Sequence, residues 1–79
     1  MGFEVHVVVE VTKPVTEALM TALDHQFEAA THEPGSRTVS LYEHVSVPSE
    51  ADALDFVRSL VMDAIPPGAK IAQISAEPD

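Results

Sequence analysis

The chain of 79 residues contains no cysteine, which excludes disulfides and thiolate metal sites as sources of stability. A domain of this size buries only about 60% of the surface that its unfolded chain exposes, so its margin of stability is thin. Further reinforcement must therefore come from a metal site without thiolates or from a partner chain. The lack of cysteine also fits a reducing compartment, and we expect a cytoplasmic protein.

Positive charge is scarce: four lysine and arginine residues stand against 13 aspartate and glutamate residues, a formal net charge of −9 at pH 7. The resulting field repels phosphate backbones, so we expect no direct binding to nucleic acid. The four cations, Lys13, Arg37, Arg58 and Lys70, are scattered along the sequence, and we expect no basic patch. Such an acidic surface serves solubility, or it suits a basic protein partner.

Long apolar runs and glycine-rich loops are also missing. No apolar run approaches the ~20 residues that span a bilayer, and no basic segment leads into an apolar one as in a signal peptide. We therefore expect no membrane association. The three glycines form no phosphate-binding loop, and no GxSxG or cysteine nucleophile is present. We expect neither an enzyme nor a cofactor.

The apolar residues, 46% of the chain, follow clear periodicities that predict strands. Apolar residues occupy every odd position in residues 3–11, which is typical of a strand with one buried face. Residues 38–47 alternate in the same way. A weaker run, residues 28–33, precedes them across a Pro-Gly-Ser turn at 34–36, so these two runs predict a β-hairpin.

Two segments repeat their apolar residues every three or four positions, which predicts amphipathic helices. The first lies within residues 12–27, with Pro14 in its first turn. Its apolar stripe comprises Val15, Leu19, Leu23 and Phe27, widened by Ala18 and Ala22. The second begins after Ser49, a favourable N-cap, with Asp52 at the third position beyond it. Its stripe comprises Ala53, Leu54, Val57, Leu60, Val61 and Ala64, extended by Phe56 and Ile65.

The element order is therefore β-α-β-β-α-β, closed by a short strand within residues 69–76 and a loose acidic tail at 77–79. This order resembles the ferredoxin-like, split βαβ group over almost the whole chain. The resemblance implies one domain, residues 1–79, with a four-stranded antiparallel sheet in the order 4-1-3-2 and two helices on one face. We expect the first and third strands to be central and parallel to each other.

The helices leave one sheet face open, and we expect the even positions of the central strands to lie on it. The candidates for interaction on this face are Glu4, His6, Val8, Glu10, Tyr42 and His44. On the last strand we expect Gln73 and Ser75 to face the same way, with Ile71 adding to an apolar centre. Ala72, Ile74 and Ala76 would then face the core.

Three histidines could ligate zinc or another divalent ion. His6 and His44 fall on the open face, and we place His32 of the weak edge strand with them. No HxH or HxxxH spacing supports such a site. Solvated histidines on a bare sheet, or a pH-sensitive interface, are the alternatives.

Glu43 conflicts with the pattern around it, because strict alternation points it into the core between Leu41 and Val45. An unpaired buried carboxylate is unfavourable. We therefore expect a β-bulge or a position at the edge of the core, where the carboxylate reaches water. The alternatives are neutralisation by Arg58 or Lys70, or a functional carboxylate.

The sequence thus favours a non-catalytic protein-interaction or assembly module. We expect a homodimer, formed through the open sheet face or an edge strand, because a thin core and an uncovered sheet both favour association. One alternative is a small-ligand or metal sensor that uses the histidines of the open face. The other is an acidic inhibitor or DNA mimic that binds a basic protein partner.

Overall fold

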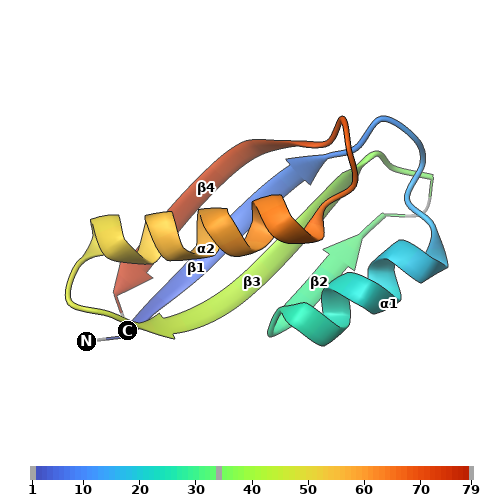
Figure 1. Cartoon of the computed structure of the whole chain (residues 1–79). Coiled ribbons are helices and arrows are strands. Elements are labelled where there is room, and N and C mark those ends of the chain that lie inside the picture. Colours follow the sequence, from blue (N-terminus) through green and yellow to red (C-terminus); the bar gives the residue numbers. More distant parts are fainter. Residues whose placement is uncertain (1, 34, 79) are drawn as a thin grey trace.

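A computed structural model describes residues 2–33 and 35–78 of the chain (Figure 1). Its elements are β1 (Gly2–Glu10), α1 (Glu17–Gln26), β2 (Ala29–His32), β3 (Thr38–Ser46), α2 (Glu50–Ala64) and β4 (Lys70–Pro78). The predicted order of strands and helices is confirmed. β4 continues through Glu77 and Pro78, so the prediction of a loose tail is wrong for these two residues. Asp79 and Pro34 of the predicted turn lie outside the described residues.

The four strands form one open sheet in the order β2-β3-β1-β4, which is the predicted order in reverse. All three neighbouring pairs are antiparallel. The expectation that the two central strands run parallel is therefore wrong. The crossover through α1 makes β1 parallel to β2, and the hairpin then reverses the chain, so β3 must run against β1.

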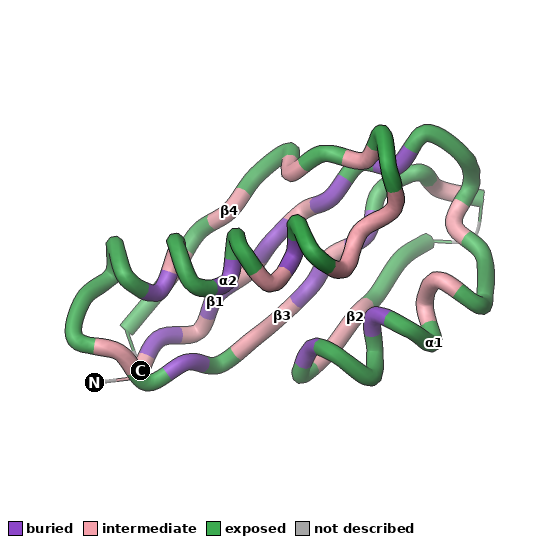
Figure 2. The backbone as a smooth tube through the Cα atoms, in the orientation of Figure 1, coloured by how far each residue is buried: buried purple, intermediate pink, exposed green. Residues whose placement is uncertain are grey.

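Both helices pack on the same face of this sheet (Figure 1). Burial alternates residue by residue along β1, and Figure 2 shows the buried positions recurring along β1 and β3 beneath α2. The buried core consists of Phe3, Val5, Val7, Val9 and Val11, Leu23 and Phe27, Val39, Leu41 and Val45, and Ala53, Val57 and Val61. Within the described residues, no polar or charged residue is classed as buried.

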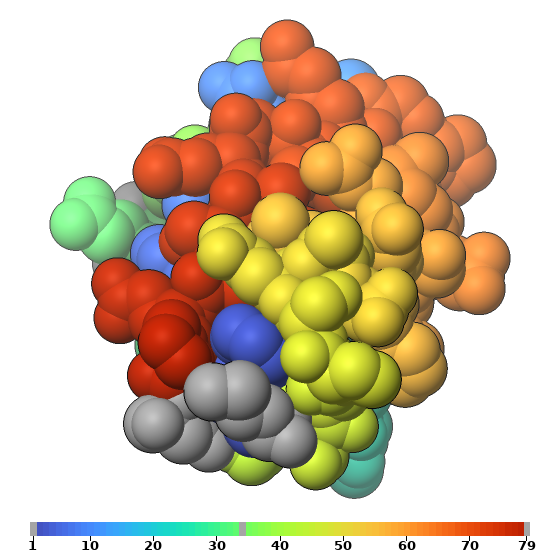
Figure 3. Space-filling model, turned by 90° about the vertical axis from the view of Figure 1, so that its left-hand side faces the viewer, coloured from blue at the N-terminus to red at the C-terminus, as the bar shows by residue number. Residues whose placement is uncertain are grey.

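A β-bulge changes the side-chain pattern of β4. Val8 lies opposite Gln73 but Val9 lies opposite Ile71, so Ala72 is the extra residue. Ile71 consequently packs against the core, as Ile74 and Ala76 do, while Ala72 is exposed. The predictions for Ile71 and Ala72 are wrong, because strict alternation contains no bulge. Figure 3 shows β4, in red, lying against α2, in yellow to orange.

Helix α1 begins later than the sequence suggests. Thr16 is its N-cap, with its hydroxyl accepting a hydrogen bond from the Leu19 N–H at 3.2 Å. Pro14 therefore precedes the helix. Ala18 and Ala22 are exposed, and the core-facing residues are instead Leu19, Met20, Leu23 and Phe27. At about 100° per residue, Ala22 lies well to one side of the stripe centred on Leu23.

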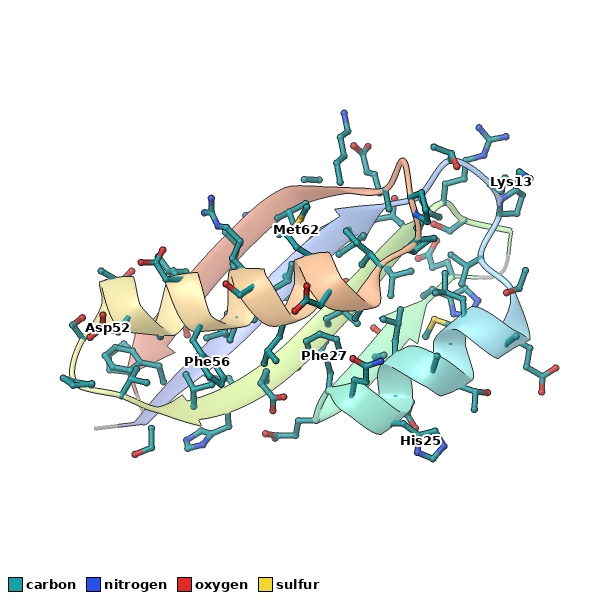
Figure 4. The ribbon with its side chains drawn as sticks, in the orientation of Figure 1. Lys13, His25, Phe27, Asp52, Phe56 and Met62 are labelled. Atoms are coloured by element: carbon teal, nitrogen blue, oxygen red, sulfur yellow. The ribbon has the colours of Figure 1, made fainter. Side chains whose placement is uncertain are left out.

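Helix α2 begins as predicted, because the Ser49 hydroxyl accepts a hydrogen bond from the Asp52 N–H at 3.2 Å. Phe56, expected to extend the buried stripe, is instead 52% exposed, and Met62 is 56% exposed. These two residues flank the buried stripe on opposite sides: Phe56 lies toward the outer edge of β3, and Met62 toward β4 (Figure 4). Neither helix of the described chain is long and apolar enough to cross a membrane.

Docking of α1 depends on one fully buried side chain, Leu23. We expect Leu23→Ala to lower the free energy of unfolding by about 3 kcal/mol, because it leaves a cavity beneath a short helix. Urea unfolding followed by circular dichroism measures this change. Thr21→Ala, at an exposed position of the same helix, is the control and should change stability by about 0.5 kcal/mol or less. Equal effects of the two substitutions would contradict the assigned face of α1.

Candidate interaction surface on the open sheet face

The side of the sheet away from the helices collects the polar positions of the three long strands. Glu4, His6, Val8 and Glu10 of β1 alternate with buried residues and therefore share this side. His6 lies opposite Tyr42 on β3 and Ser75 on β4. Glu4 lies opposite His44 and Glu77 in the same two strands. The structure thus places all six sequence-derived candidates on one face, and we call this surface the open face.

The hydrogen-bond phase of the β1–β3 ladder explains which side chains meet. The Val11 N–H donates to the Arg37 carbonyl at 2.8 Å, one step beyond the Glu10–Thr38 pair. Odd residues of β1 therefore form the hydrogen-bonded pairs. Even residues form the other type of pair, in which opposite side chains lie closer together. His6 and Tyr42 are such a pair.

His6 and Tyr42 stack on each other at the centre of the open face. Their ring centroids are 4.6 Å apart, and the planes differ by 1°. Both residues are half-buried, as is Val8 in the next even position. Stacking covers the imidazole so fully that its Nε2 atom is buried, and this atom has no hydrogen-bond partner among the described residues. A buried polar atom left unpaired costs about 1–3 kcal/mol, so this pair is an anomaly of the open face.

Charge is distributed unevenly along the open face. At one end Glu4 lies directly opposite Glu77, and like charges in facing positions repel. At the other end Glu10 forms an ion pair with Lys70, with 3.5 Å between the Glu10 Oε2 and the Lys70 Nζ. The face therefore has an acidic end and an end at which charges are balanced.

Three of the four cations gather at the balanced end, which contradicts the expectation that they are scattered. Arg37 and Lys70 line one shallow hollow of about 260 Å³ beside Thr12. Lys13 lines the adjoining hollow (Figure 4). Sequence spacing could not show this, because the three residues come from two loops and the start of β4, which the sheet brings together.

The histidines divide between the two sides of the sheet. His44 is a diagonal neighbour of His6 on the open face, since it lies opposite Glu4. His32 lies opposite the buried residue Val39, so it belongs to the helix side. The prediction that His32 joins the open face is therefore wrong. Within residues 2–33 and 35–78, no three metal-ligating side chains lie close enough together to hold an ion.

Glu43 lies at the edge of the core, which is one of the two arrangements that we expected from the sequence. The β1–β3 register runs through Glu43 without a bulge, and Glu43 faces the helix side opposite Val5. It is half-buried, and its Oε1 accepts a hydrogen bond from the His44 N–H at 3.2 Å. Lys70, a candidate partner for this carboxylate, pairs with Glu10 instead.

Glu43 also stands where the β2–β3 pairing stops. β2 pairs only with residues 39–42 of β3, so His44 carries the first outward-pointing N–H beyond the end of β2. The Glu43 carboxylate covers that N–H. An inward-pointing charge of this kind discourages another strand from pairing with the edge. The sequence showed the anomaly, but its cause lies in the short length of β2.

The other outer edges carry comparable features. β2 has only four residues. β4 starts with Lys70, contains the bulge at Ala72 and ends with Pro78. Lysine, bulges and proline at an edge all oppose unwanted strand pairing. The open face carries no comparable protection at its half-buried centre.

Comparison of the chain with protein-family models, with curated proteins and with solved structures gave no match.

Replacing Glu43 by valine tests its role at the sheet edge. We expect Glu43→Val to raise the free energy of unfolding by about 1 kcal/mol, because it adds apolar surface to the helix side. The same change should increase aggregation, because it uncovers the His44 N–H and removes the edge charge. Urea unfolding and light scattering during heating measure the two effects.

Glu33→Val, at an exposed position of the β2–β3 hairpin, is the charge-matched control for this substitution. If Glu43→Val aggregates no more than Glu33→Val, the edge-protecting role of Glu43 is wrong.

Proposed function

We propose that the chain is a non-catalytic, cytoplasmic assembly module of the ferredoxin-like type that forms a homodimer through its open face. The element order and strand order are those of the split βαβ arrangement, which supports the fold assignment. One observation carries the functional proposal. The open face has a stacked aromatic centre beside a half-buried valine, while the outer edges of the sheet are each blunted.

This contrast favours the face over the edges as the surface of association. Edge pairing would have to displace Glu43 or accommodate the bulge of β4. Packing of two sheets requires no such change, because side chains from two aligned faces interdigitate. An aromatic and aliphatic centre with a polar rim is also the usual composition of protein interfaces.

The dimensions of the face suit a modest interface. Strands spaced about 4.8 Å apart that rise about 3.3 Å per residue make a face on the order of 500 Å². Stable interfaces bury about 800 Å² per partner, so this face falls at the small end of the range. We therefore expect a weak dimer, with a Kd on the order of 10–100 μM.

The uneven charge of the face determines the relative orientation of the two copies. A parallel arrangement would bring the Glu4 and Glu77 end of one copy against the same end of the other. An antiparallel arrangement about a twofold axis places this acidic end against the partner end that carries Lys70. Complementary charge suppresses wrong orientations, so the antiparallel dimer is favoured.

Disruption of the centre of the face tests the dimer. Sedimentation equilibrium of the unmodified protein should give a concentration-dependent monomer–dimer equilibrium. Val8→Glu should raise the dimer Kd at least about tenfold, because it places a charge in the apolar centre. Ser59→Glu, on an exposed part of α2, should leave the Kd unchanged. A protein that stays monomeric at about 1 mM, or equal effects of both substitutions, would refute the proposal.

A charge exchange tests the antiparallel orientation separately. Lys70→Glu should weaken the dimer about threefold to tenfold, because two acidic ends then face each other. The double variant Lys70→Glu with Glu77→Lys should restore the dimer, since the polarity of the face is simply reversed. Circular dichroism establishes that each variant is folded. Failure of the double variant to recover affinity would exclude the antiparallel arrangement while leaving dimerisation itself standing.

A further inference from the structure

Positive charge gathers where the balanced end of the open face continues onto the loops beyond β1. Lys13, Arg37 and Lys70, three of the four cations of the chain, line two adjoining hollows there. Among the described residues that line these hollows, Glu10 is the only acid. Glu17, in the first turn of α1, is exposed and belongs to neither lining. Three cations and one carboxylate give the lining a formal charge of +2, whereas the whole chain carries −9.

The two hollows share one wall, formed by Val11 and Thr12. One ligand can therefore extend from the first hollow into the second. The first hollow, of about 260 Å³, contains Arg37 and Lys70. The second, of about 320 Å³, is mainly apolar, and its lining consists of Val11, Pro14, Leu19, Pro66 and Pro67 with Thr12, Lys13 and Thr16. Sites for small molecules start at about 300 Å³ and combine apolar walls with a few polar groups in the same way.

Rigid residues form the walls of the apolar hollow. Pro66 and Pro67 line it from the loop after α2, and Pro14 lines it from the loop after β1 (Figure 1). The Ala69 N–H donates to the Pro66 carbonyl at 3.1 Å and closes a tight turn, in which Gly68 adopts a φ of +88°. Proline rings fix their own φ angles, so these walls lose little conformational freedom when a ligand binds.

Backbone hydrogen bonds hold two cationic segments beside this hollow. The Val11 N–H donates to the Arg37 carbonyl at 2.8 Å, and the Val15 N–H donates to the Ser36 carbonyl at 3.1 Å. These bonds join the loop after β1, which carries Lys13, to the segment before β3, which carries Arg37. The positive charges of the two segments repel each other in the free protein, and an anion bound between them turns this repulsion into attraction.

We propose that the two hollows bind a small amphipathic anion, a ligand with a ring-sized apolar body and a carboxylate or phosphate head. The apolar body lies between Pro14 and the two prolines of the loop after α2. The head lies beside Thr12, where the hollows meet, and is neutralised by Lys13 and Arg37. The Arg37 guanidinium offers paired N–H donors that match the oxygens of either head group, and the Thr12 hydroxyl is a further donor.

The other charges of the chain support this choice of ligand. The Glu10 carboxylate pairs with Lys70 at 3.5 Å, so Lys13 and Arg37 supply the charge that the lining has left for a ligand. Arg58, the fourth cation, lies apart from them in the groove beside β4. Because the chain as a whole is strongly acidic, an anion is attracted to this pocket and repelled by most of the remaining surface.

Titration with two aromatic anions tests the site. The probes are phenylacetate and phenyl phosphate, each added to ¹⁵N-labelled protein. We expect saturable amide shifts concentrated in residues 11–16, 36–38 and 66–70. The expected Kd is on the order of 1 mM, because a ligand of about ten non-hydrogen atoms gains only a modest binding free energy. The probe with the lower Kd identifies the preferred head group.

Two analogues separate the contributions of head and body. Phenylacetamide keeps the ring without the charge, and acetate keeps the charge without the ring. Each should bind at least about tenfold more weakly than phenylacetate, because each makes only one of the two contacts. If acetate binds as tightly as phenylacetate, this end of the molecule is a general counter-ion surface and the proposal is wrong.

Protein variants test the same two contacts. Arg37→Gln and Lys13→Gln should each weaken phenylacetate binding about threefold to tenfold and reduce its dependence on salt. Arg58→Gln is the matched control for both and should bind normally. Pro67→Ser should weaken binding about threefold by removing one apolar wall, whereas Pro48→Ser, between β3 and α2, should have no effect. All five positions are exposed, and circular dichroism establishes that the variants are folded.

An absence of saturable shifts with both probes would overturn the site. Shifts centred on the open face, or equal losses in Arg37→Gln and Arg58→Gln, would overturn it as well. The outcome is independent of dimer formation, because none of these variants alters Glu10 or Lys70, which also border the open face. Val8→Glu should bind phenylacetate normally even where it no longer dimerises.

Discussion

The structure depends on the one-sided burial of β1. Its odd residues are buried between the sheet and the two helices, and the helices supply their own buried residues to the same cluster. A strand that is buried on one side must present its even residues on the other. The stacked His6–Tyr42 pair, the half-buried Val8 and the uneven charge of the open face all follow from that division. A domain with so small a core gains stability whenever a partner covers its second face.

The second constraint is the difference in length between β2 and β3. The β2–β3 pairs extend only from Val39 to Tyr42 of β3 and end there. Glu43 lies on the core side of β3 just beyond the last of these pairs, and Phe56 is exposed on the flank of α2 instead of in the core. These features look unrelated in the sequence. In the structure both lie where the short β2–β3 ladder ends.

The sequence predicted the order of elements, the strand order and most of the core, because strict alternation in β1 and β3 and the Ser49 cap are local signals. It failed where the outcome depends on contacts between elements. The bulge at Ala72 turns the Ile71 side chain to the opposite face of the sheet. The rotation of α2 about its axis leaves Phe56 outside the core. The short length of β2 determines what surrounds Glu43. For the open face, the alternation of odd and even positions along each strand was enough to place His6, Tyr42 and His44. The side of the sheet on which His32 lies depends on the register of the β2–β3 hairpin, which the sequence does not show.

The central claim is that the open face is covered by a second copy of the chain. Isotope-filtered NOE measurement on a mixture of ¹³C-labelled and unlabelled protein tests it most directly, because only contacts between copies give signals. The account predicts intermolecular NOEs from the Val8 methyl groups to the Tyr42 ring, and from Lys70 to Glu77. Intermolecular NOEs that arise only from the edges of β3 or β4, or none at concentrations well above the dimer Kd, would contradict it.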